Sequence, residues 1–211
     1  MDTRGKHAES FIREHTRIAP VPFVPEIRIH TAAELTPVWE TFLTEHSLGL
    51  PYWCVPWAGG QALARWVLDH AEVVRGKRVL DFGTGSGLVA IAAAKSGARV
   101  HAVDIDPFAT VAAALNADAN GVELTTECGD LSGSAIEADV VLAGDVWYER
   151  EPAERFVAWF RDLAARGIRI VTGDPGRAYV PTDAAELARY DVPTTLDLES
   201  KTSALTRVLG L

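Results

Sequence analysis

The stretch DFGTGSG at residues 81–87 ends an apolar run, KRVLDF at residues 77–82, and leads into a run of small apolar residues. This order predicts a strand, a tight glycine turn and a helix. Glycine at positions 83 and 85 lets the backbone turn sharply, and the free N–H groups at the start of the helix favour a polar ligand. On its own the turn is weak evidence for a ligand, because a tight turn without one explains the glycines too.

Strands and helices are expected to alternate on both sides of this turn. Strands are predicted at residues 77–82, 99–104, 122–127, 138–143 and 168–172, and helices at 61–74, 88–95, 106–120 and 151–166. A short helix is expected after Thr182, and the runs at 191–198 and 204–211 are close enough to pair as an antiparallel hairpin. The prediction is an α/β fold, a Rossmann-like seven-stranded methyltransferase-type sheet, mostly parallel with the last strand antiparallel, and helices on both faces.

The N-terminal part differs in composition from the rest. Three prolines, Pro20, Pro22 and Pro25, exclude a continuous helix and favour an extended strap. A capping box formed by Thr31 and Glu34 predicts the start of a helix that ends near residue 47. We therefore expect residues 1–50 to form a strap and helix packed on a domain of residues 51–211, within a single folded unit.

The details around the glycine turn distinguish between two cofactor classes. A dinucleotide fingerprint needs glycine at position 88, where this chain has Leu88. The acid Asp81, two residues before the first glycine, suits the cationic amino group of a methionine moiety better than a pyrophosphate. Asp104 ends the second strand, where a carboxylate can hold both ribose hydroxyls. The pattern predicts S-adenosylmethionine (SAM) as the cofactor.

A further acid follows the third expected strand. Asp130 comes directly after Gly129 and could accept a hydrogen bond from the adenine amino group. It could equally be a solvated loop residue. Asp106, which precedes Pro107, is interpreted as the N-cap of the next helix.

Several longer motifs carry a resemblance to a known family. They are VPEIR at 24–28, PYW at 51–53, WAGGQAL at 57–63, DIDP at 104–107, GDVWY at 144–148 and GDPGR at 173–177. With these motifs the chain resembles the class I SAM-dependent methyltransferases. More closely, it resembles the seven-β-strand protein-lysine methyltransferases, in particular those of the electron transfer flavoprotein beta subunit and their bacterial relatives.

The resemblance implies roles for individual residues. Trp57 is expected to lie against the cofactor, Gly144 to line the same cavity, and Asp145 and Tyr148 to face the substrate. The candidate cofactor-binding residues are Trp57, Asp81, Gly83, Thr84, Gly85, Asp104, Ile105, Asp130 and Gly144, and the candidate catalytic residues are Asp145, Trp147 and Tyr148. The implied substrate is a protein lysine, with a small amine as the alternative and a non-catalytic SAM-binding module as a weaker one.

Simpler interpretations of the substrate-side residues stay open at this point. Asp145 could orient an incoming amine or cap a loop, and Trp147 and Tyr148 could be cavity walls or core aromatics. Asp174 and Arg177 could form an ion pair within their loop or a clamp on the substrate.

The composition of the chain limits the cellular compartments and the classes of partner that we expect for it. The 211 residues carry a formal net charge of −9, and 16 of the 20 basic residues are Arg, without the basic stripe typical of nucleic-acid binding. The longest apolar run, Leu88 to Ala94, is too short to span a membrane. With two Cys and scattered His, neither a disulfide scaffold nor a metal site is expected. We expect a cytoplasmic protein without a metal, a membrane anchor or a nucleic-acid partner.

Overall fold

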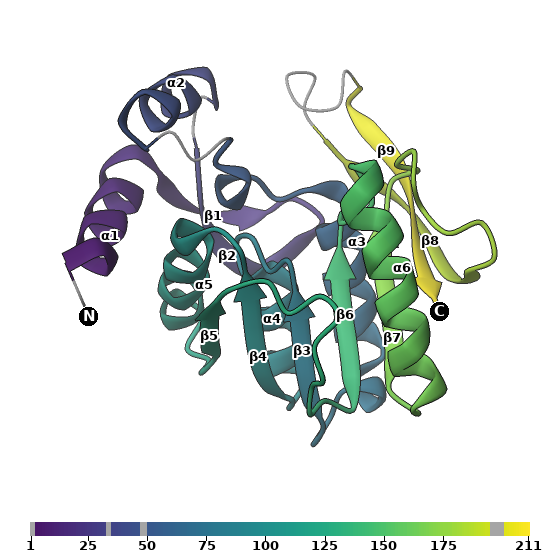
Figure 1. Cartoon of the computed structure of the whole chain (residues 1–211). Coiled ribbons are helices and arrows are strands. Elements are labelled where there is room, and N and C mark those ends of the chain that lie inside the picture. The colour runs from purple at the N-terminus through teal and green to yellow at the C-terminus, as the bar shows by residue number, and fades with distance from the viewer. Residues whose placement is uncertain (1–2, 33–34, 47–49, 195–200) are drawn as a thin grey trace.

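The computed structural model describes residues 3–32, 35–46, 50–194 and 201–211, and its main feature is a seven-stranded sheet (Figure 1). The strand order is β5-β4-β3-β6-β7-β9-β8. The strands are β3 Arg78–Phe82, β4 Arg99–Asp104, β5 Thr125–Cys128, β6 Val140–Gly144, β7 Arg169–Asp174, β8 Ala185–Pro193 and β9 Ser203–Gly210. Neighbours from β5 to β7 are parallel, and β9 is antiparallel to both of its neighbours. The predicted fold class is confirmed.

Helices cover both faces of this sheet, as Figure 1 shows. One face carries α3 Ala58–Asp69, α4 Leu88–Lys95 and α5 Pro107–Ala119. The other carries α6 Arg150–Ala165, whose Trp159, Phe160 and Leu163 are buried against Leu80 and Ile170 of the sheet. The parallel strands are therefore enclosed on both sides, which explains their nearly continuous apolar sequences.

The expected helix after Thr182 is wrong. Residues from Ala185 form β8, which pairs with β9 from Ala185↔Gly210 to Pro193↔Ser203. The hairpin predicted at the C-terminus is present, but its first strand begins six residues earlier than expected. Pairing with β9, which continues on both sides of an irregularity between Glu186 and Ala188, outweighs the local helix propensity of these residues.

The N-terminal part is more regular than the predicted strap. It contains α1 Thr3–His15, a hairpin of β1 Arg17–Val21 and β2 Val24–Thr31, and α2 Leu35–His46. Thr31 lies in β2, and its Oγ1 donates to the carbonyl oxygen of Cys54, so it does not cap the helix. Glu34, the other half of the expected capping box, lies outside the described residues.

Asparagine side chains in α5 and at its C-cap fix this hairpin to α5. Asn120 accepts a hydrogen bond from the N–H of Arg28 and donates one to its carbonyl oxygen, as a neighbouring strand would. Asn116 accepts from the N–H of His30. An aromatic cluster that includes Phe11, Phe42, Trp53 and Phe108 lies between α1, α2, α5 and the 3-10 turn Tyr52–Cys54. We propose that residues 1–50 and 51–211 fold as one unit, because this cluster joins them.

None of the helices in the described ranges combines the length and the apolar character that a membrane crossing requires.

Candidate active site

The glycine turn joins β3 to α4 as predicted, and its three glycines all have positive φ angles. These angles are 67° at Gly83, 51° at Gly85 and 78° at Gly87, in a region that residues with a side chain rarely adopt. A Cβ on Gly87 would lie 2.9 Å from the backbone of Ala113 in α5. A Cβ on Gly85 would meet nothing within 4 Å, so the space beside the middle of the turn is open.

Asp81 does not face that open space, contrary to the sequence-based expectation. It is 1% exposed, and its Oδ2 accepts hydrogen bonds from Thr84 Oγ1 at 2.6 Å and from the N–H of Ala90 at 3.0 Å. Burial raises the pKa of this carboxyl to about 7, although both hydrogen bonds act in the opposite direction. Asp81 therefore connects β3 to the glycine turn and to the start of α4.

Asp104 is placed at the carboxyl edge as predicted. Its Oδ2 accepts from the N–H of Gly85 at 2.8 Å and its Oδ1 from the N–H of Asp106 at 3.0 Å. Each oxygen keeps a further lone pair for an additional donor. The next residue, Ile105, is 74% exposed and presents an apolar surface beside this carboxylate. Asp106 caps α5 through the N–H of Phe108, as expected.

Asp130 is exposed, and local partners engage its carboxylate. Its Oδ1 accepts from the N–H of Ser132 at 2.8 Å, and its Oδ2 lies 3.5 Å from Arg155 in α6. Both interpretations of Asp130, a loop residue and an acceptor for a base, are compatible with this position.

The start of α3 packs against the ends of β6 and β7 at backbone distance. A Cβ on Gly173 would lie 2.1 Å from the carbonyl oxygen of Gly59, and one on Gly144 would lie 2.9 Å from Gly60 Cα. This approach requires glycine at positions 144 and 173 of the sheet and at position 59 of α3, where a Cβ would lie 2.3 Å from the carbonyl oxygen of Gly173. Gly144 thus serves the contact with α3, in addition to any contact with a cofactor that the resemblance implied.

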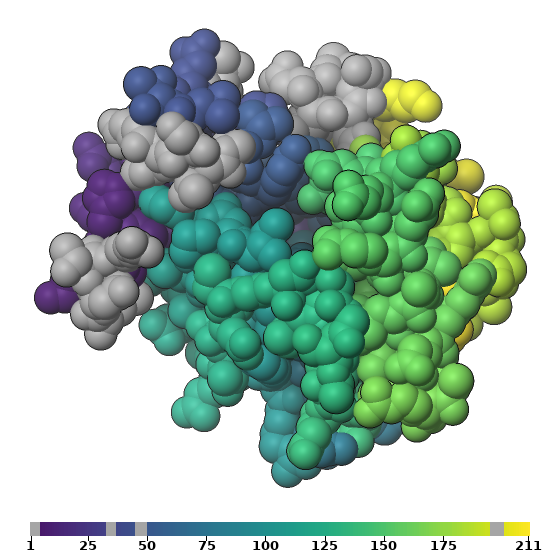
Figure 2. All heavy atoms as spheres, viewed as in Figure 1, coloured from purple at the N-terminus to yellow at the C-terminus, as the bar shows by residue number. Residues whose placement is uncertain are grey.

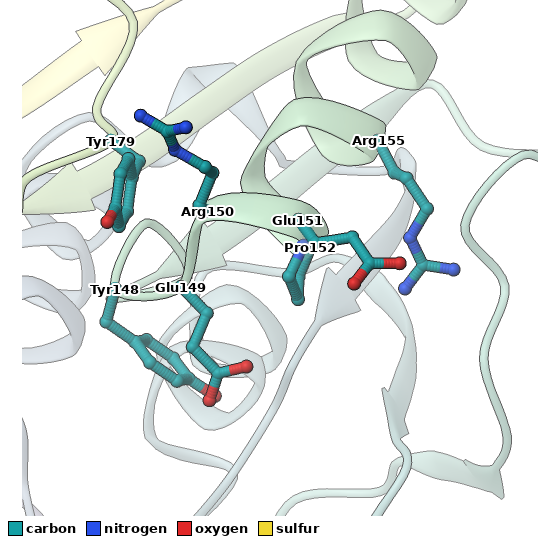
Figure 3. A pocket seen from close by; sticks show the side chains of 7 residues that line it. All are labelled: Tyr148, Glu149, Arg150, Glu151, Pro152, Arg155 and Tyr179. Atoms are coloured by element: carbon teal, nitrogen blue, oxygen red, sulfur yellow. The ribbon is translucent and has the colours of Figure 1, made fainter.

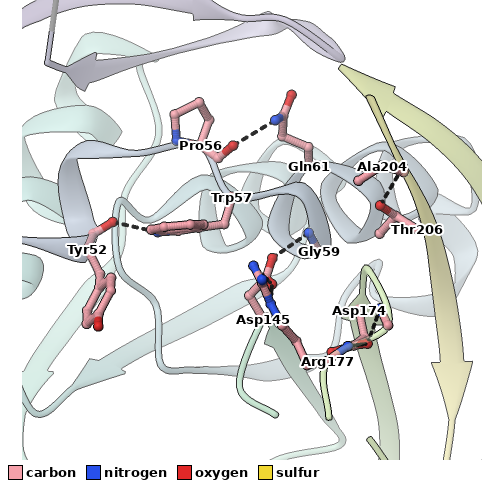
Figure 4. A network of polar contacts seen from close by, with 11 residues as sticks. Tyr52, Pro56, Trp57, Gly59, Gln61, Asp145, Asp174, Arg177, Ala204 and Thr206 are labelled. Carbon is pink, nitrogen blue, oxygen red and sulfur yellow. Dashed lines mark hydrogen bonds and ion pairs between the residues drawn. The ribbon is translucent and has the colours of Figure 1, made fainter. Parts of the chain in front are cut away.

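Asp145 follows β6 and is 8% exposed. Its Oδ2 accepts from the N–H of Gly59, and its Oδ1 lies 2.9 Å from both Nε and an Nη of Arg177 (Figure 4). Burial raises the pKa of Asp145 to about 6, and the charge of Arg177 opposes this rise. It is also the one non-glycine residue with a positive φ, 58°, in the described part of the chain. Such a strained position beside a cavity is typical of functional sites.

The two aromatic residues that follow Asp145 in the motif, Trp147 and Tyr148, differ in their exposure to solvent. Trp147 is fully buried, packs on Phe160, and donates through Nε1 to Thr172 Oγ1 at 3.4 Å. It belongs to the core under α6, so the alternative interpretation of Trp147 holds and it is not a cavity wall. Tyr148 is 51% exposed, with its ring 5.9 Å from that of Tyr52.

Tyr148 also borders a pocket of about 550 Å³ (Figure 3). The pocket is lined by Tyr148, Glu149, Arg150, Glu151, Pro152, Arg155 and Tyr179. Burial raises the pKa of Tyr148 to about 12, and the neighbouring Tyr52 and Glu149 add to this rise, so its hydroxyl stays protonated at neutral pH. Aromatic, acidic and basic side chains therefore lie together beside the GDVWY motif at 144–148.

Trp57 precedes α3 and lies on the same side as Asp145. Its Nε1 donates to the carbonyl oxygen of Tyr52, and its ring lies 5.8 Å from the Tyr52 ring (Figure 4). The surface is hollowed between the blue segment that contains Tyr52 and Trp57 and the green segment after β6 (Figure 2). The structure thus places Trp57 and Tyr148 at one edge of the sheet, with the carboxyl ends of β3, β4 and β6 beside them.

Two participants were not among the sequence candidates. Gly59 donates to Asp145 Oδ2, and the guanidinium of Arg177 pairs with Asp145 Oδ1, while the backbone N–H of Arg177 donates to Asp174 Oδ1. The GDPGR motif drew attention to Arg177, but its partner lies 32 positions away and no local pattern indicates it.

Comparison with known proteins extends the resemblance. The family model of ribosomal protein L11 methyltransferase (PrmA) matches residues 62–144. The electron transfer flavoprotein beta subunit lysine methyltransferase of Xenopus laevis is 39% identical over 173 residues, which cover 80% of this chain and 70% of that protein. The rat enzyme of the same name is 34% identical over 197 residues, covering 88% and 76%. The ribosomal protein L11 methyltransferase of Geobacter sulfurreducens is 38% identical over 149 residues, 48% of its length.

Solved structures share the fold. Magnesium protoporphyrin IX methyltransferase from Synechocystis PCC 6803, solved with bound SAM, superimposes with a TM-score of 0.56 at 21% identity and covers 85% of this chain and 98% of its own. A putative RNA methyltransferase from Pyrococcus horikoshii gives 0.51 at 17% identity, covering 72% and 79%. At these identities the likeness concerns the fold alone.

Proposed function

Because the chain belongs to the family of electron transfer flavoprotein beta subunit lysine methyltransferases, we propose that it methylates lysine side chains of that subunit with SAM as the methyl donor. The enzyme class, a SAM-dependent protein-lysine methyltransferase, follows from the family. The observation that carries the proposal in the structure is the position of Asp145. It lies at the carboxyl edge with a positive φ, next to the exposed Tyr148.

The residues at this edge fit the cofactor. The space beside Gly85 is open, Asp104 keeps lone pairs for two ribose hydroxyls, and the exposed Ile105 can cover one face of a base. We propose that these three residues and Trp57 hold SAM, and that Asp130 contacts its adenine. When bound, the cofactor supplies a methyl group made electrophilic by its sulfonium.

The protein's task is then to deliver a neutral amine in line with that methyl group. A free lysine with a pKa of about 10.4 loses its proton at pH 7 at a cost of roughly 4 to 5 kcal/mol. A buried carboxylate such as Asp145 attracts and orients an ammonium, but its charge also favours the protonated form. Asp145 therefore serves as an orienting acceptor, since its Oδ2 keeps a lone pair beyond the one that accepts from Gly59.

Tyr148 and the adjoining pocket lie where the acceptor protein would arrive. The Tyr148 ring offers a π face to a cationic side chain and excludes water from one side of it. We propose that residues flanking the acceptor lysine occupy the pocket between Tyr148 and Tyr179 (Figure 3).

The test is methylation of purified proteins. The enzyme and SAM are incubated with recombinant electron transfer flavoprotein beta subunit, with ribosomal protein L11, or with small amines, and intact mass is measured. The proposal expects mass increases of whole methyl groups on the flavoprotein subunit, formed about 100-fold more slowly by Asp145→Asn. Methylation of small amines alone, or of L11 alone, would contradict it.

A further inference from the structure

Arg177, in the loop after β7, lies beside both Asp145 after β6 and Trp57 before α3. Its Nε and one Nη lie 2.9 Å from Asp145 Oδ1, and its guanidinium carbon lies 5.8 Å from the centre of the Trp57 ring (Figure 4). It is partly buried, with 25% of its side chain exposed. The guanidinium of Arg177 therefore lies beside both the Asp145 carboxylate and the Trp57 ring.

The backbone around Arg177 is fixed by Asp174. Asp174 Oδ1 accepts hydrogen bonds from the N–H groups of Gly176 at 2.6 Å and of Arg177 at 2.8 Å. Gly176 has a φ of 97°, a conformation that allows the chain to double back after β7. The guanidinium is thus carried on a short braced turn and not on a free loop, which favours one defined position beside Asp145.

Two neighbouring charges act on Asp145, the positive charge of Arg177 and the negative charge of Asp174. Asp174 approaches it from β7, and the carboxylates of Asp104 and Glu149 influence Tyr148 from the other side. Arg207 of β9 lies opposite Asp174 in the sheet, and its charge lowers the pKa of Asp174. Without the charge of Arg177, an amine beside Asp145 would meet a net negative environment, which holds its proton.

We propose that Arg177 is a positioning residue for methyl transfer: it neutralises Asp145, so that the acceptor amine arrives beside a neutral ion pair and gives up its proton more readily. A neighbouring cation lowers the pKa of a reactive lysine by the same electrostatic rule. This inference rests on the proposed function, because it requires an amine acceptor.

The first experiment compares the pH dependence of kcat/KM for Arg177→Gln, Arg177→Lys and the wild type on the flavoprotein subunit. We expect Arg177→Gln to reduce the rate at pH 7.5 by about tenfold and to shift the rising limb of the profile upward by about one pH unit. Arg177→Lys retains the charge and restores the profile. An unchanged profile in Arg177→Gln, or an Arg177→Lys profile as shifted as that of Arg177→Gln, overturns the proposal.

Controls separate folding from charge. Arg161→Gln removes an exposed arginine that pairs with Asp183 at 2.7 Å, and should leave the profile unchanged. Calorimetric SAM binding and thermal denaturation establish that each variant is folded. Should Arg177→Gln fail these checks, Arg177→Lys alone decides, because the proposal requires it to keep the wild-type limb within a few tenths of a pH unit.

A second measurement needs no acceptor. The carboxyl carbon of Asp145, assigned by its loss in Asp145→Asn, is titrated by NMR in the wild type and in Arg177→Gln. We expect the pKa of Asp145 to rise by about one unit or more when the arginine is removed. An unchanged pKa overturns the inference even if methylation is observed. Failure of the wild type to methylate any protein refutes the proposed function while this titration still reports on the pair.

Discussion

Asp145 caps helix α3 from 86 positions away, by accepting a hydrogen bond from the backbone N–H of Gly59 at Oδ2. The N-cap residue of α3, Trp57, makes no side-chain capping bond of its own. A carboxylate at a helix N-terminus is also favoured by the helix dipole. Asp145, which we assign to the acceptor amine, is therefore held in place by α3. The same helix begins directly after Trp57, which we assign to the cofactor.

Asp145→Asn tests the catalytic assignment while changing the backbone as little as possible. Asparagine tolerates a positive φ better than alanine does, and its carbonyl oxygen can still accept from Gly59. We expect SAM affinity to stay within about threefold, and kcat to fall by about 100-fold, the usual scale for losing a positioned polar group. Calorimetry and single-turnover kinetics measure the two quantities. Retained turnover would remove Asp145 from the reaction.

Gly173→Ala tests the close approach of α3 to the sheet. The new Cβ would lie 2.1 Å from the carbonyl oxygen of Gly59, which neither backbone can avoid. We expect a loss of about 3 kcal/mol or more in the free energy of unfolding. The matched control is Gly60→Ala, whose Cβ would meet only Leu88 Cδ2 at 3.9 Å and which sits inside the helix. It should leave stability unchanged or slightly higher, as measured by urea denaturation.

Local sequence could predict the parts of the fold that local physics decides. The glycine turn, the cap at Asp106 and the strand ending in Asp104 were all confirmed, because each follows from a short pattern. The position of Arg177 beside Asp145, the burial of Trp147 and the strand from Ala185 depend on contacts with distant residues. A carboxylate two residues before a glycine turn is likewise recognisable, but whether it faces the ligand or the helix is a tertiary outcome. The carboxylate of Asp81 accepts its hydrogen bonds from Thr84 and from the N–H of Ala90 in α4.

Tyr148 and Trp147 are adjacent in the chain, and the structure predicts opposite phenotypes for them. Tyr148→Ala removes an exposed ring at the pocket, so KM for the acceptor protein should rise by about tenfold with little change in thermal stability. Trp147→Phe leaves Thr172 without its indole donor and opens a space beside Phe160. It should lower the free energy of unfolding by about 1 to 3 kcal/mol and leave KM unchanged. Steady-state kinetics and urea denaturation of both variants measure these effects. A stability loss in Tyr148→Ala together with a raised KM in Trp147→Phe would contradict the prediction.

Asp104→Ala tests the predicted cofactor edge. The carboxylate is placed to accept two ribose hydroxyls and also holds the N–H of Gly85, so its loss should weaken both ligand contacts and the turn. We expect SAM affinity to fall by about 30-fold or more, which corresponds to roughly 2 kcal/mol for hydrogen bonds to a charged group. Calorimetry measures the change. Asp118→Ala, an exposed acid on α5, is the control and should bind SAM normally. Equal affinity in the two variants would exclude Asp104 from the site.

The buried Asp81 predicts a dependence of stability on pH. Burial raises the pKa of the folded carboxyl to about 7, above its ordinary value of 3.8, so the folded state binds the proton more tightly than the unfolded state does. Stability therefore falls as pH rises from about 4 to 7, and Asp81→Asn, which carries no charge, escapes this loss. Relative to the wild type, Asp81→Asn should gain stability between pH 5 and pH 8, up to about 3 kcal/mol for a shift of this size.

The matched control for this prediction is an acid with the opposite shift. Hydrogen bonds and charge from Arg78 lower the pKa of Asp139 to about 2, so this group stays ionised at both pH 5 and pH 8 in the folded state. Asp139→Asn should therefore change stability by nearly the same amount at the two pH values. Urea denaturation of the wild type and both variants at pH 5 and pH 8 measures the difference. If Asp81→Asn parallels the wild type as closely as Asp139→Asn does, the Asp81 carboxyl does not titrate in this range, and its hydrogen bonds with Thr84 and Ala90 hold it ionised throughout.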